Sequence, residues 1–234
     1  MKRVLVVEDE AIIREFVVIN LQRAGYTVVE ADNGKTALEL IRTDKIGFPV
    51  VLTDVMMPEM DGLELCKEIR KADRNTGIIM LSAKTQEMDK ISGLLNGADD
   101  YITKPFSPAE LVARVDSLYR RVDRLVKEAE AQPANAEITL GKFKLNLRRR
   151  MFFKNDELVE LTHTEYQIME YLFNNPGMTI SRNDILEKVW GDAYVGEDKI
   201  VDVNIRRLRM KIEIDPSSPE HLATVWGIGY KWKS

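Results

Sequence analysis

Residues 50–62 read VVLTDVMMPEMDG. The apolar run Val50–Leu52 leads directly into Asp54, and the turn residues Pro58 and Asp61-Gly62 follow. An apolar run that does not alternate with polar residues is typical of a strand covered on both faces, as in a parallel sheet. A carboxylate at the end of such a strand costs stability unless hydrogen bonds or opposite charges compensate for it. The stretch therefore predicts a buried strand, and it predicts that other parts of the chain supply groups for Asp54 to face.

Short apolar runs and helical patterns alternate in the same way throughout residues 1–121. β-rich runs are predicted at Val4–Val7, Thr27–Val29, Val50–Leu52, Ile78–Leu81 and Tyr101–Thr103. Helical patterns follow them at residues 12–21, 37–41, 63–69, 88–95 and 111–118. Five strand–helix repeats predict an α/β domain with a doubly wound parallel sheet. The strand order 2-1-3-4-5 would place strands one, three, four and five side by side.

The chain changes character after residue 121. Residues 122–137 lose the β pattern and are rich in small and charged residues, so we expect the tail of the fifth helix to run into a linker there. Beyond it, β-like runs occur at 138–140, 143–147, 151–153 and 158–161, helical patterns at 165–174, 183–190 and 200–212, and a terminal ribbon around Gly227 and Gly229. This order predicts an α+β winged helix. The predicted domains are 1–121 and 138–234, with 122–137 as the linker.

Chemically useful side chains stand where four of the predicted strands end. Glu8-Asp9 follow the first strand, Asp54 the third, Ser82 the fourth and Lys104 the fifth. Ligands bind outside the carboxyl ends of the strands in an open parallel sheet, so these groups should converge. Three carboxylates would repel one another, and a hard divalent cation such as Mg²⁺ removes that repulsion. With a lysine beside it, an aspartate in such a cluster can act as a nucleophile and receive a phosphoryl group.

Each of these residues also has an ordinary structural explanation when it is taken singly. Asp9 could cap the following helix, Asp54 and Ser82 could cap a turn or a helix, and Lys104 could be a surface lysine. Four separate elements that end in mutually compatible chemistry favour a site over four unrelated structural roles.

The stretches VLVVEDE (4–10), VVLTDVMMPEMDG (50–62), IIMLSAK (78–84) and GADDYITKPF (97–106) resemble the receiver domain of two-component response regulators. The resemblance covers about residues 1–121 and implies a flavodoxin-like fold with Asp54 as the phosphorylated residue. It implies Mg²⁺ ligation by Asp9, Asp54 and the Met56 backbone carbonyl, with Glu8 acting mostly through water. It also implies catalytic roles for Lys104 and Ser82, a switch formed by Ser82 and Tyr101, and a cis bond before Pro105.

The face formed by the fourth helix, fifth strand and fifth helix carries complementary charges. A solvated surface is the simpler explanation, because exposed ion pairs contribute little singly. The resemblance implies instead that this face dimerises on phosphorylation through pairs between subunits. We expect these pairs to join Lys90 to Glu110 and Asp99 or Asp100 to Arg114 or Arg121. Asp116 departs from the family pattern, which often has a basic residue there.

The last predicted helix has one apolar and one basic face. Val201, Ile205, Leu208 and Ile212 fall on the apolar face. Together with a Thr162-x-x-Glu165 capping box and the ending TVWGIGYKW (224–232), the sequence over 138–234 resembles the DNA-binding domain of the OmpR/PhoB family. The resemblance implies entry of this helix into the major groove, with Asn204 and Arg207 at base edges. The full set of expected DNA contacts is Lys199, Asn204, Arg206, Arg207, Arg209, Lys211, Thr224, Trp226 and Lys231.

The terminal ribbon departs from its relatives at Trp226, where many have an arginine that reaches the minor groove. A tryptophan cannot supply the charge that favours narrow A·T-rich grooves. We expect Trp226 either to pack under the ribbon or to stack on a sugar, while lysines take the phosphates.

Composition places the chain among soluble globular proteins, with 44% hydrophobic and 31% charged residues and a net charge of −4. No apolar stretch approaches the roughly 20 residues that span a bilayer, and the single cysteine fits a reducing cytoplasm. We therefore expect a cytoplasmic, non-enzymatic regulator whose partners are a sensor histidine kinase, tandem half-sites in promoter DNA, RNA polymerase and a second copy of itself.

Two other functions fit parts of the pattern. A magnesium-dependent phosphatase of the haloacid dehalogenase type also uses an aspartyl phosphate, but it needs a second aspartate where this chain has Met56. A receiver joined to a protein-binding winged helix remains the other alternative. DNA binding that weakens steeply with salt would distinguish a DNA-binding protein from it.

Overall fold

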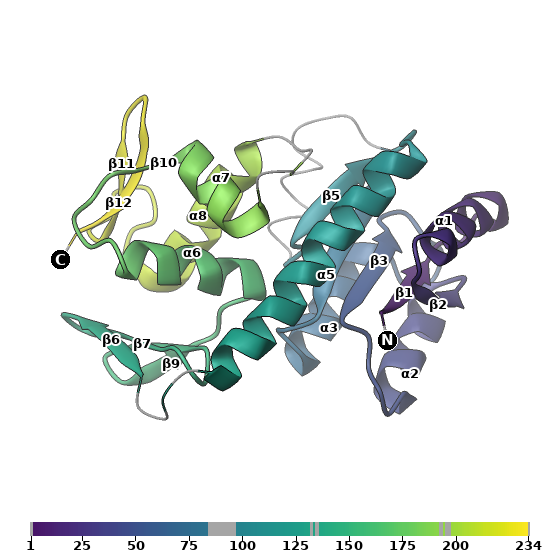
Figure 1. Cartoon of the computed structure of the whole chain (residues 1–234), viewed down its shortest axis with the longest axis horizontal. Helices are drawn as coiled ribbons and strands as arrows, with labels where there is room; N and C mark the ends of the chain where they lie inside the picture. The colour runs from purple at the N-terminus through teal and green to yellow at the C-terminus, as the bar shows by residue number, and fades with distance from the viewer. Residues whose placement is uncertain are drawn as a thin grey trace. The chain divides into compact units, whose positions relative to one another are not determined.

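The computed structural model describes residues 2–83, 97–131, 133, 136–191, 194 and 198–233, and gives no side chains for 125–131. Contacts divide the chain into two compact units, Met1–Val122 and Asp123–Ser234 (Figure 1). Each unit has sheets of its own. None of the described helices is long and apolar enough to cross a membrane.

The first unit contains a five-stranded parallel sheet made of β1 (Arg3–Val7), β2 (Thr27–Ala31), β3 (Val50–Asp54), β4 (Gly77–Ser82) and β5 (Asp100–Thr103). Its order, β2-β1-β3-β4-β5, confirms the predicted one. The register aligns Val7 with Thr53, Asp54 with Leu81, and Ser82 with Thr103. The carboxyl ends of four strands therefore lie level with one another at one edge of the sheet.

Helices cover both faces of this sheet. They are α1 (Ala11–Arg23), α2 (Gly34–Thr43), α3 (Gly62–Ala72) and α5 (Pro108–Ala131). Apolar residues of α1 and α5 form one core with the strand residues beneath them, and α2 and α3 lie beside one another (Figure 1). The predicted helix at 88–95 lies outside the described residues. Helix α5 continues to Ala131, so much of the segment in which we expected a linker is helical.

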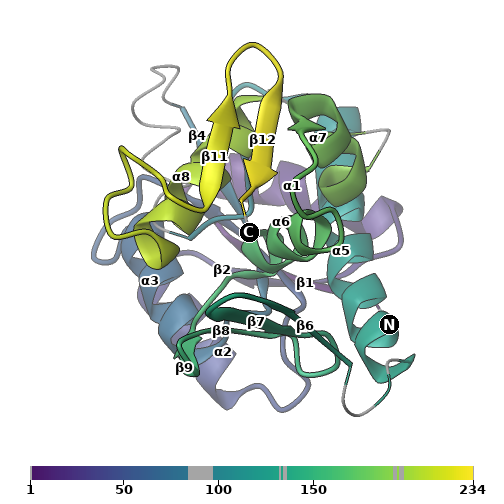
Figure 2. The same cartoon turned by 90° about the vertical axis from the view of Figure 1, so that its left-hand side faces the viewer.

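The second unit begins with an antiparallel sheet of four strands, β6 (Glu137–Leu140), β7 (Phe143–Asn146), β8 (Met151–Lys154) and β9 (Glu157–Val159). Three helices follow, α6 (His163–Phe173), α7 (Arg182–Trp190) and α8 (Lys199–Ile212). The chain ends in the ribbon of β11 (Leu222–Val225) and β12 (Gly229–Trp232), which Figure 2 shows in yellow. Four strands, three helices and a terminal ribbon are the predicted winged-helix order.

A short strand that the sequence did not predict, β10 (Ile180–Ser181), pairs with β12 and completes a three-stranded sheet. The backbones approach closely here, because a Cβ on Gly229 would lie 2.0 Å from the carbonyl oxygen of Ile180. Only glycine fits such an approach. Gly229 is therefore needed both for the ribbon and for its attachment to the helices.

Candidate functional site

Three carboxylates from two neighbouring strands converge at the carboxyl edge of the parallel sheet. Glu8 and Asp9 follow β1, and Asp54 is the last residue of β3. One oxygen from each of the three lies within 4.8 Å of the others. Glu8 and Asp54 are buried, whereas Asp9 is exposed. For Asp9 and Asp54 the ordinary explanations do not hold, because Glu10 rather than Asp9 is the cap residue of α1 and Asp54 forms an ion pair with Lys104.

Lys104, directly after β5, is the cation that faces this cluster. Its Nζ lies 2.8 Å from Oε2 of Glu8 and 3.0 Å from Oδ2 of Asp54. The peptide bond from Lys104 to Pro105 is cis, as the resemblance implied. The groups predicted to face Asp54 are thus found in a largely buried ion-pair cluster that joins the ends of β1, β3 and β5.

The surroundings change the proton affinity of both Glu8 and Lys104. Burial raises the pKa of Glu8 to about 7, although the hydrogen bond from Lys104 acts to lower it. Burial alone would lower the pKa of Lys104, but its bonds to Glu8 and Asp54 outweigh that effect and raise it. One ammonium group therefore does not fully compensate for the carboxylates around it. A site with excess buried negative charge attracts a further cation.

The loop after β3 holds Asp54 in place. The Val55 amide donates to Oδ1 of Asp54 at 2.7 Å and so orients the carboxylate. Gly62 starts α3 against this strand end, where a Cβ would lie 2.0 Å from the Asp54 carbonyl oxygen. The sequence pattern indicates only a turn at Gly62. Its role in the site depends on the close approach of its Cα to the Asp54 backbone across the loop, which the residue pattern does not reveal.

The donor set fits a divalent metal ion. Oε1 of Glu8 is buried and accepts a hydrogen bond from none of the described residues. A buried carboxylate oxygen without a donor is costly unless a ligand meets it. Carboxylate oxygens in this number, with room for water on the exposed side at Asp9, suit Mg²⁺.

The two residues expected to act as a switch lie on the neighbouring strands. Ser82 ends β4 and Tyr101 is the second residue of β5, and both are buried. The register pairs Tyr101 with Met80 and Ser82 with Thr103, so both lie on adjacent strands at the same side of the site as Lys104. Met56, whose carbonyl was expected to ligate the metal, is 59% exposed two residues beyond Asp54.

The charged face expected to dimerise is already paired within one chain. Nη1 of Arg114 lies 3.0 Å from Asp100, and Nη2 lies 2.9 Å from Glu110. Asp116 accepts hydrogen bonds from Lys2 and Tyr26. Pairs between subunits would therefore have to share or exchange these partners.

Two of the expected interface residues differ from the expectation in other ways. Asp99 is fully buried and pairs within the chain with Arg70 of α3 at 2.7 Å. Asp99 precedes β5, whereas Asp100 begins it and, although also buried, bonds to Arg114 of α5. Arg121 is buried on α5. Lys90 lies outside the described residues.

The basic residues of α8 point in different directions. Val201, Ile205, Leu208 and Ile212 are buried and confirm the predicted core face. Lys199 and Arg206 are exposed, and Arg209 and Lys211 are half-buried.

Asn204 and Arg207 do not agree with the expectation that they reach base edges. They are 0% and 3% exposed, and Nε of Arg207 lies 2.9 Å from Oε1 of Glu165 on α6. Asn204 donates to the carbonyl oxygen of Ile200 within its own helix. Arg207 therefore ties α8 to α6, whereas the bonds of Asn204 lie within α8. The sequence pattern of a basic helix is the same whether a given cation faces solvent or neutralises a buried carboxylate.

The ribbon presents an exposed aromatic tip. Trp226 is 90% exposed, so the alternative in which it packs under the ribbon is wrong. Gly227, with a φ of 73°, makes the turn beside it. Thr224 and Lys231 are half-buried on the two strands of the ribbon.

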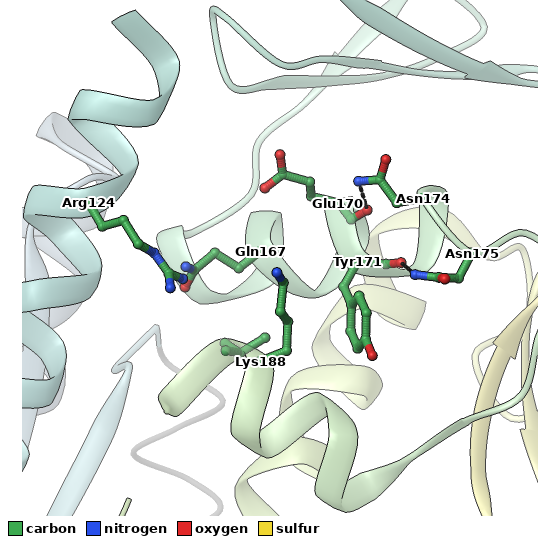
Figure 3. Close-up of a pocket in the computed structure, with 8 residues that line it drawn as sticks. Arg124, Gln167, Glu170, Tyr171, Asn174, Asn175 and Lys188 are labelled. Carbon is green, nitrogen blue, oxygen red and sulfur yellow. Dashed lines mark hydrogen bonds between the residues drawn. The ribbon is translucent and has the colours of Figure 1, made fainter. Parts of the chain in front are cut away.

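A polar hollow of about 290 Å³ lies along α6 and α7 (Figure 3). The side chains of Tyr171 and Lys188 border it, and Asn174 and Asn175 bond back to the carbonyl oxygens of Glu170 and Tyr171. It contains none of the residues predicted to bind metal, phosphate or DNA.

Comparisons with known proteins agree with this architecture. The family described as "Response regulator receiver domain" matches residues 4–116, and "Transcriptional regulatory protein, C terminal" matches residues 155–232. A probable transcriptional regulatory protein of Picosynechococcus sp. is 41% identical over 98% of this chain and 92% of its own. The sensory transduction protein RegX3 of Mycobacterium tuberculosis is 37% identical over 99% of both chains.

A solved structure, the response regulator DrrB of Thermotoga maritima, is described as an OmpR/PhoB homolog. It is 31% identical over 100% of both chains, with a TM-score of 0.50. The matches cover both units and extend over almost the whole chain. The chain therefore belongs to the OmpR/PhoB family of two-component response regulators, with a receiver domain followed by a winged-helix DNA-binding domain.

Proposed function

We propose that this protein is a transcriptional regulator controlled by phosphorylation of Asp54. The observation that carries the proposal is the cluster of Glu8, Asp9, Asp54 and Lys104 at the carboxyl edge of the sheet. A sensor histidine kinase would supply the phosphoryl group. The modified protein would dimerise, bind tandem half-sites in promoter DNA and act there on RNA polymerase.

The residues of the cluster have separate roles in phosphoryl transfer. A carboxylate oxygen of Asp54 forms a bond to phosphorus while the bond from phosphorus to the kinase histidine breaks and its electron pair returns to the imidazole. Lys104 moves from the Asp54 carboxylate to the phosphoryl oxygens and neutralises their charge. Glu8, Asp9 and Asp54 would hold Mg²⁺, which supplies further charge neutralisation.

The new phosphoryl oxygens would then be detected by the switch residues. We expect the Ser82 hydroxyl to donate to one of them and Tyr101 to occupy the space beside it. Local hydrogen bonding of this kind can bias a two-state element. The face with Asp100, Glu110 and Arg114 adjoins these residues and is the proposed dimer surface.

The DNA surface proposed for the second domain is smaller than the sequence suggested. Lys199 and Arg206 on α8 and Trp226 at the ribbon tip are exposed, and Thr224 and Lys231 line the ribbon. A helix anchored by an apolar face and flanked by an exposed ribbon is the arrangement that major-groove entry requires.

Phosphorylation can be tested with acetyl phosphate and Mg²⁺ followed by mass spectrometry of the intact chain. The wild-type protein should gain one phosphoryl group, and Asp54→Asn should gain none. Asp61→Asn is the matched control, because Asp61 lies seven positions after Asp54 and caps α3 outside the cluster. Phosphorylation of Asp54→Asn to the wild-type extent would disprove the assignment.

A further inference from the structure

Glu165 is a buried charge at the base of the DNA-binding domain. It is 0% exposed and is the third residue of the α6 capping box, in which its carboxylate accepts from the Thr162 amide at 2.7 Å. The capping box accounts for a glutamate at this position of the helix. It does not compensate for a full negative charge removed from water.

Two basic residues of α8 provide the compensation. Nε of Arg207 lies 2.9 Å from one oxygen of Glu165, and Nζ of Lys211 lies 2.5 Å from the other. Lys211 also donates to the carbonyl oxygen of Glu160 at 2.8 Å. Burial alone would raise the pKa of Glu165, but the charges of Arg207 and Lys211 outweigh it and hold the pKa below its usual value.

A third basic residue of α8 is held by the ribbon. Nε of Arg209 donates to the Leu222 carbonyl oxygen at 2.9 Å, and Nη2 donates to the Thr224 hydroxyl at 2.8 Å. Arg206 differs from all three. It is exposed, and no hydrogen bond or ion pair joins it to another of the residues that the structure describes.

We propose that Glu165 is a positioning residue that retains Arg207 and Lys211 as internal counter-ions, so that these two cations do not neutralise DNA phosphates. Among these four basic residues, Arg206 is then the one that contacts the DNA backbone. The inference rests on the proposed DNA-binding function and specifies which charges carry it.

The physical reason is an unequal cost of leaving the current partner. If Lys211 turned to a phosphate, the fully buried Glu165 would lose one of its two counter-ions. Arg206 has only water to lose when it meets a phosphate. Each phosphate neutralised by a protein cation steepens the dependence of binding on salt, with a slope of about −0.9 in log K against log[salt]. The slope therefore counts the cations that reach DNA.

The test compares the salt slopes of two variants of the full chain, Arg206→Met and Lys211→Met, which each remove one cation from the same helix. The probe is a random-sequence DNA duplex, since non-specific binding is almost wholly electrostatic. Affinities are measured from 50 to 200 mM salt. Arg206→Met should reduce the magnitude of the slope by about 0.9. Lys211→Met should leave the slope unchanged and lower the thermal midpoint.

A slope reduced by about 0.9 in a folded Lys211→Met protein would overturn the proposal, as would an unchanged slope in Arg206→Met. If Lys211→Met does not fold, Glu165→Gln decides, because releasing Lys211 should steepen the slope while an unchanged slope contradicts the retention. Absence of DNA binding by the wild-type protein at low salt would instead contradict the proposed function.

Discussion

Glu8 and Glu165 are both buried carboxylates, but their surroundings suit them to different roles. Each lies beside a lysine, but Arg207 and Lys211 place a cation within ion-pair distance of both oxygens of Glu165, whereas no cation of the described residues pairs with Oε1 of Glu8. A carboxylate with both oxygens paired is complete within the chain. A carboxylate with one open oxygen is ready for a ligand, and this difference separates a stabilising charge from a binding one.

Gly62 should be irreplaceable because its backbone lies so close to that of Asp54. In Gly62→Ala the new Cβ would meet the Asp54 carbonyl oxygen at 2.0 Å, so the start of α3 or the end of β3 must move. We expect a loss of about 1–3 kcal/mol or more in the free energy of unfolding. Urea denaturation of the full chain, followed by circular dichroism, measures it.

Gly25→Ala provides the control. Gly25 has a φ of 88° and open space around it, so its substitution carries a backbone cost of about 1–2 kcal/mol without a collision. Phosphorylation by acetyl phosphate should survive in Gly25→Ala and fall in Gly62→Ala. Equal phosphorylation of the two variants would show that Gly62 does not support the site.

The residues of the acidic cluster and its lysine could be predicted from the sequence, because the end of a strand determines where each one lies. Glu8, Asp54 and Lys104 each follow an apolar run, and parallel pairing then brings them together. Asn204 and Arg207 were not predictable in this way. Arg207 is buried against Glu165, which is far away in the sequence, and a helical period alone places both residues beside the exposed face.

Among the helices and strands, apolar runs predicted the five strands of the first unit. The helical spacing of apolar residues predicted the basic helix of the second. The missed strand β10 has only two residues, Ile180 and Ser181, and owes its existence to pairing with β12. Helix α5 extends to Ala131 because residues such as Leu125, Glu128 and Ala129 are good helix formers. Small and charged residues are also common in linkers, so composition alone does not separate the two.

Helix α1 offers an apolar surface beside the acidic cluster. Ile12 is 84% exposed in its first turn, and Phe16 contacts the ring of Phe106 while remaining partly exposed. If this surface receives the kinase, Ile12→Lys should slow phosphoryl transfer from a sensor kinase that phosphorylates the wild-type chain. We expect a change on the order of tenfold, with no change in labelling by acetyl phosphate.

Ile46→Lys is the comparison, because Ile46 is 79% exposed but precedes β3 at the opposite end of the sheet. Transfer rates are followed by radiolabelled phosphate. A kinase that acts equally well on Ile12→Lys and the wild type does not use α1 as its docking surface.

The loop after α2 is tied to β1 by an ion pair that should respond to acid. Arg3 donates to Asp44 at 2.7 and 2.8 Å, and Asp44 also accepts from the Ile46 and Gly47 amides. The hydrogen bond from Arg3 holds the pKa of Asp44 well below its usual range. A lowered pKa in the folded state contributes stability above the unfolded pKa of about 4, and this contribution is lost as the pH falls towards the folded value.

Asp44→Asn should therefore lower the thermal midpoint at pH 7, and its difference from the wild type should shrink by pH 3. Differential scanning calorimetry at both pH values measures the two midpoints. Glu39→Gln, which changes an exposed acid on α2, should show no such difference. A gap that stays constant with pH would show that the charge of Asp44 does not contribute.

For the whole molecule, the proposed function requires that phosphate on one domain changes the DNA affinity of the other. Coupling between sites is typically worth about 1–3 kcal/mol, or about 5–150-fold in affinity. Treatment with acetyl phosphate and Mg²⁺ should raise both the dimer fraction in sedimentation and the affinity for promoter fragments selected from genomic DNA. Asp54→Asn should show neither change. A rise in affinity in that variant would separate DNA binding from phosphorylation.

The exposed tip of the ribbon has an optical consequence. The three tryptophans are Trp190, Trp226 and Trp232, and the first unit has none. Trp190 and Trp232 are 2% and 1% exposed, so a water-borne quencher such as acrylamide meets Trp226 almost alone. Acrylamide quenching of the tryptophan fluorescence therefore reports chiefly on the ribbon tip. Protection from quenching on addition of DNA would follow the approach of the ribbon, while the receiver contributes no tryptophan signal.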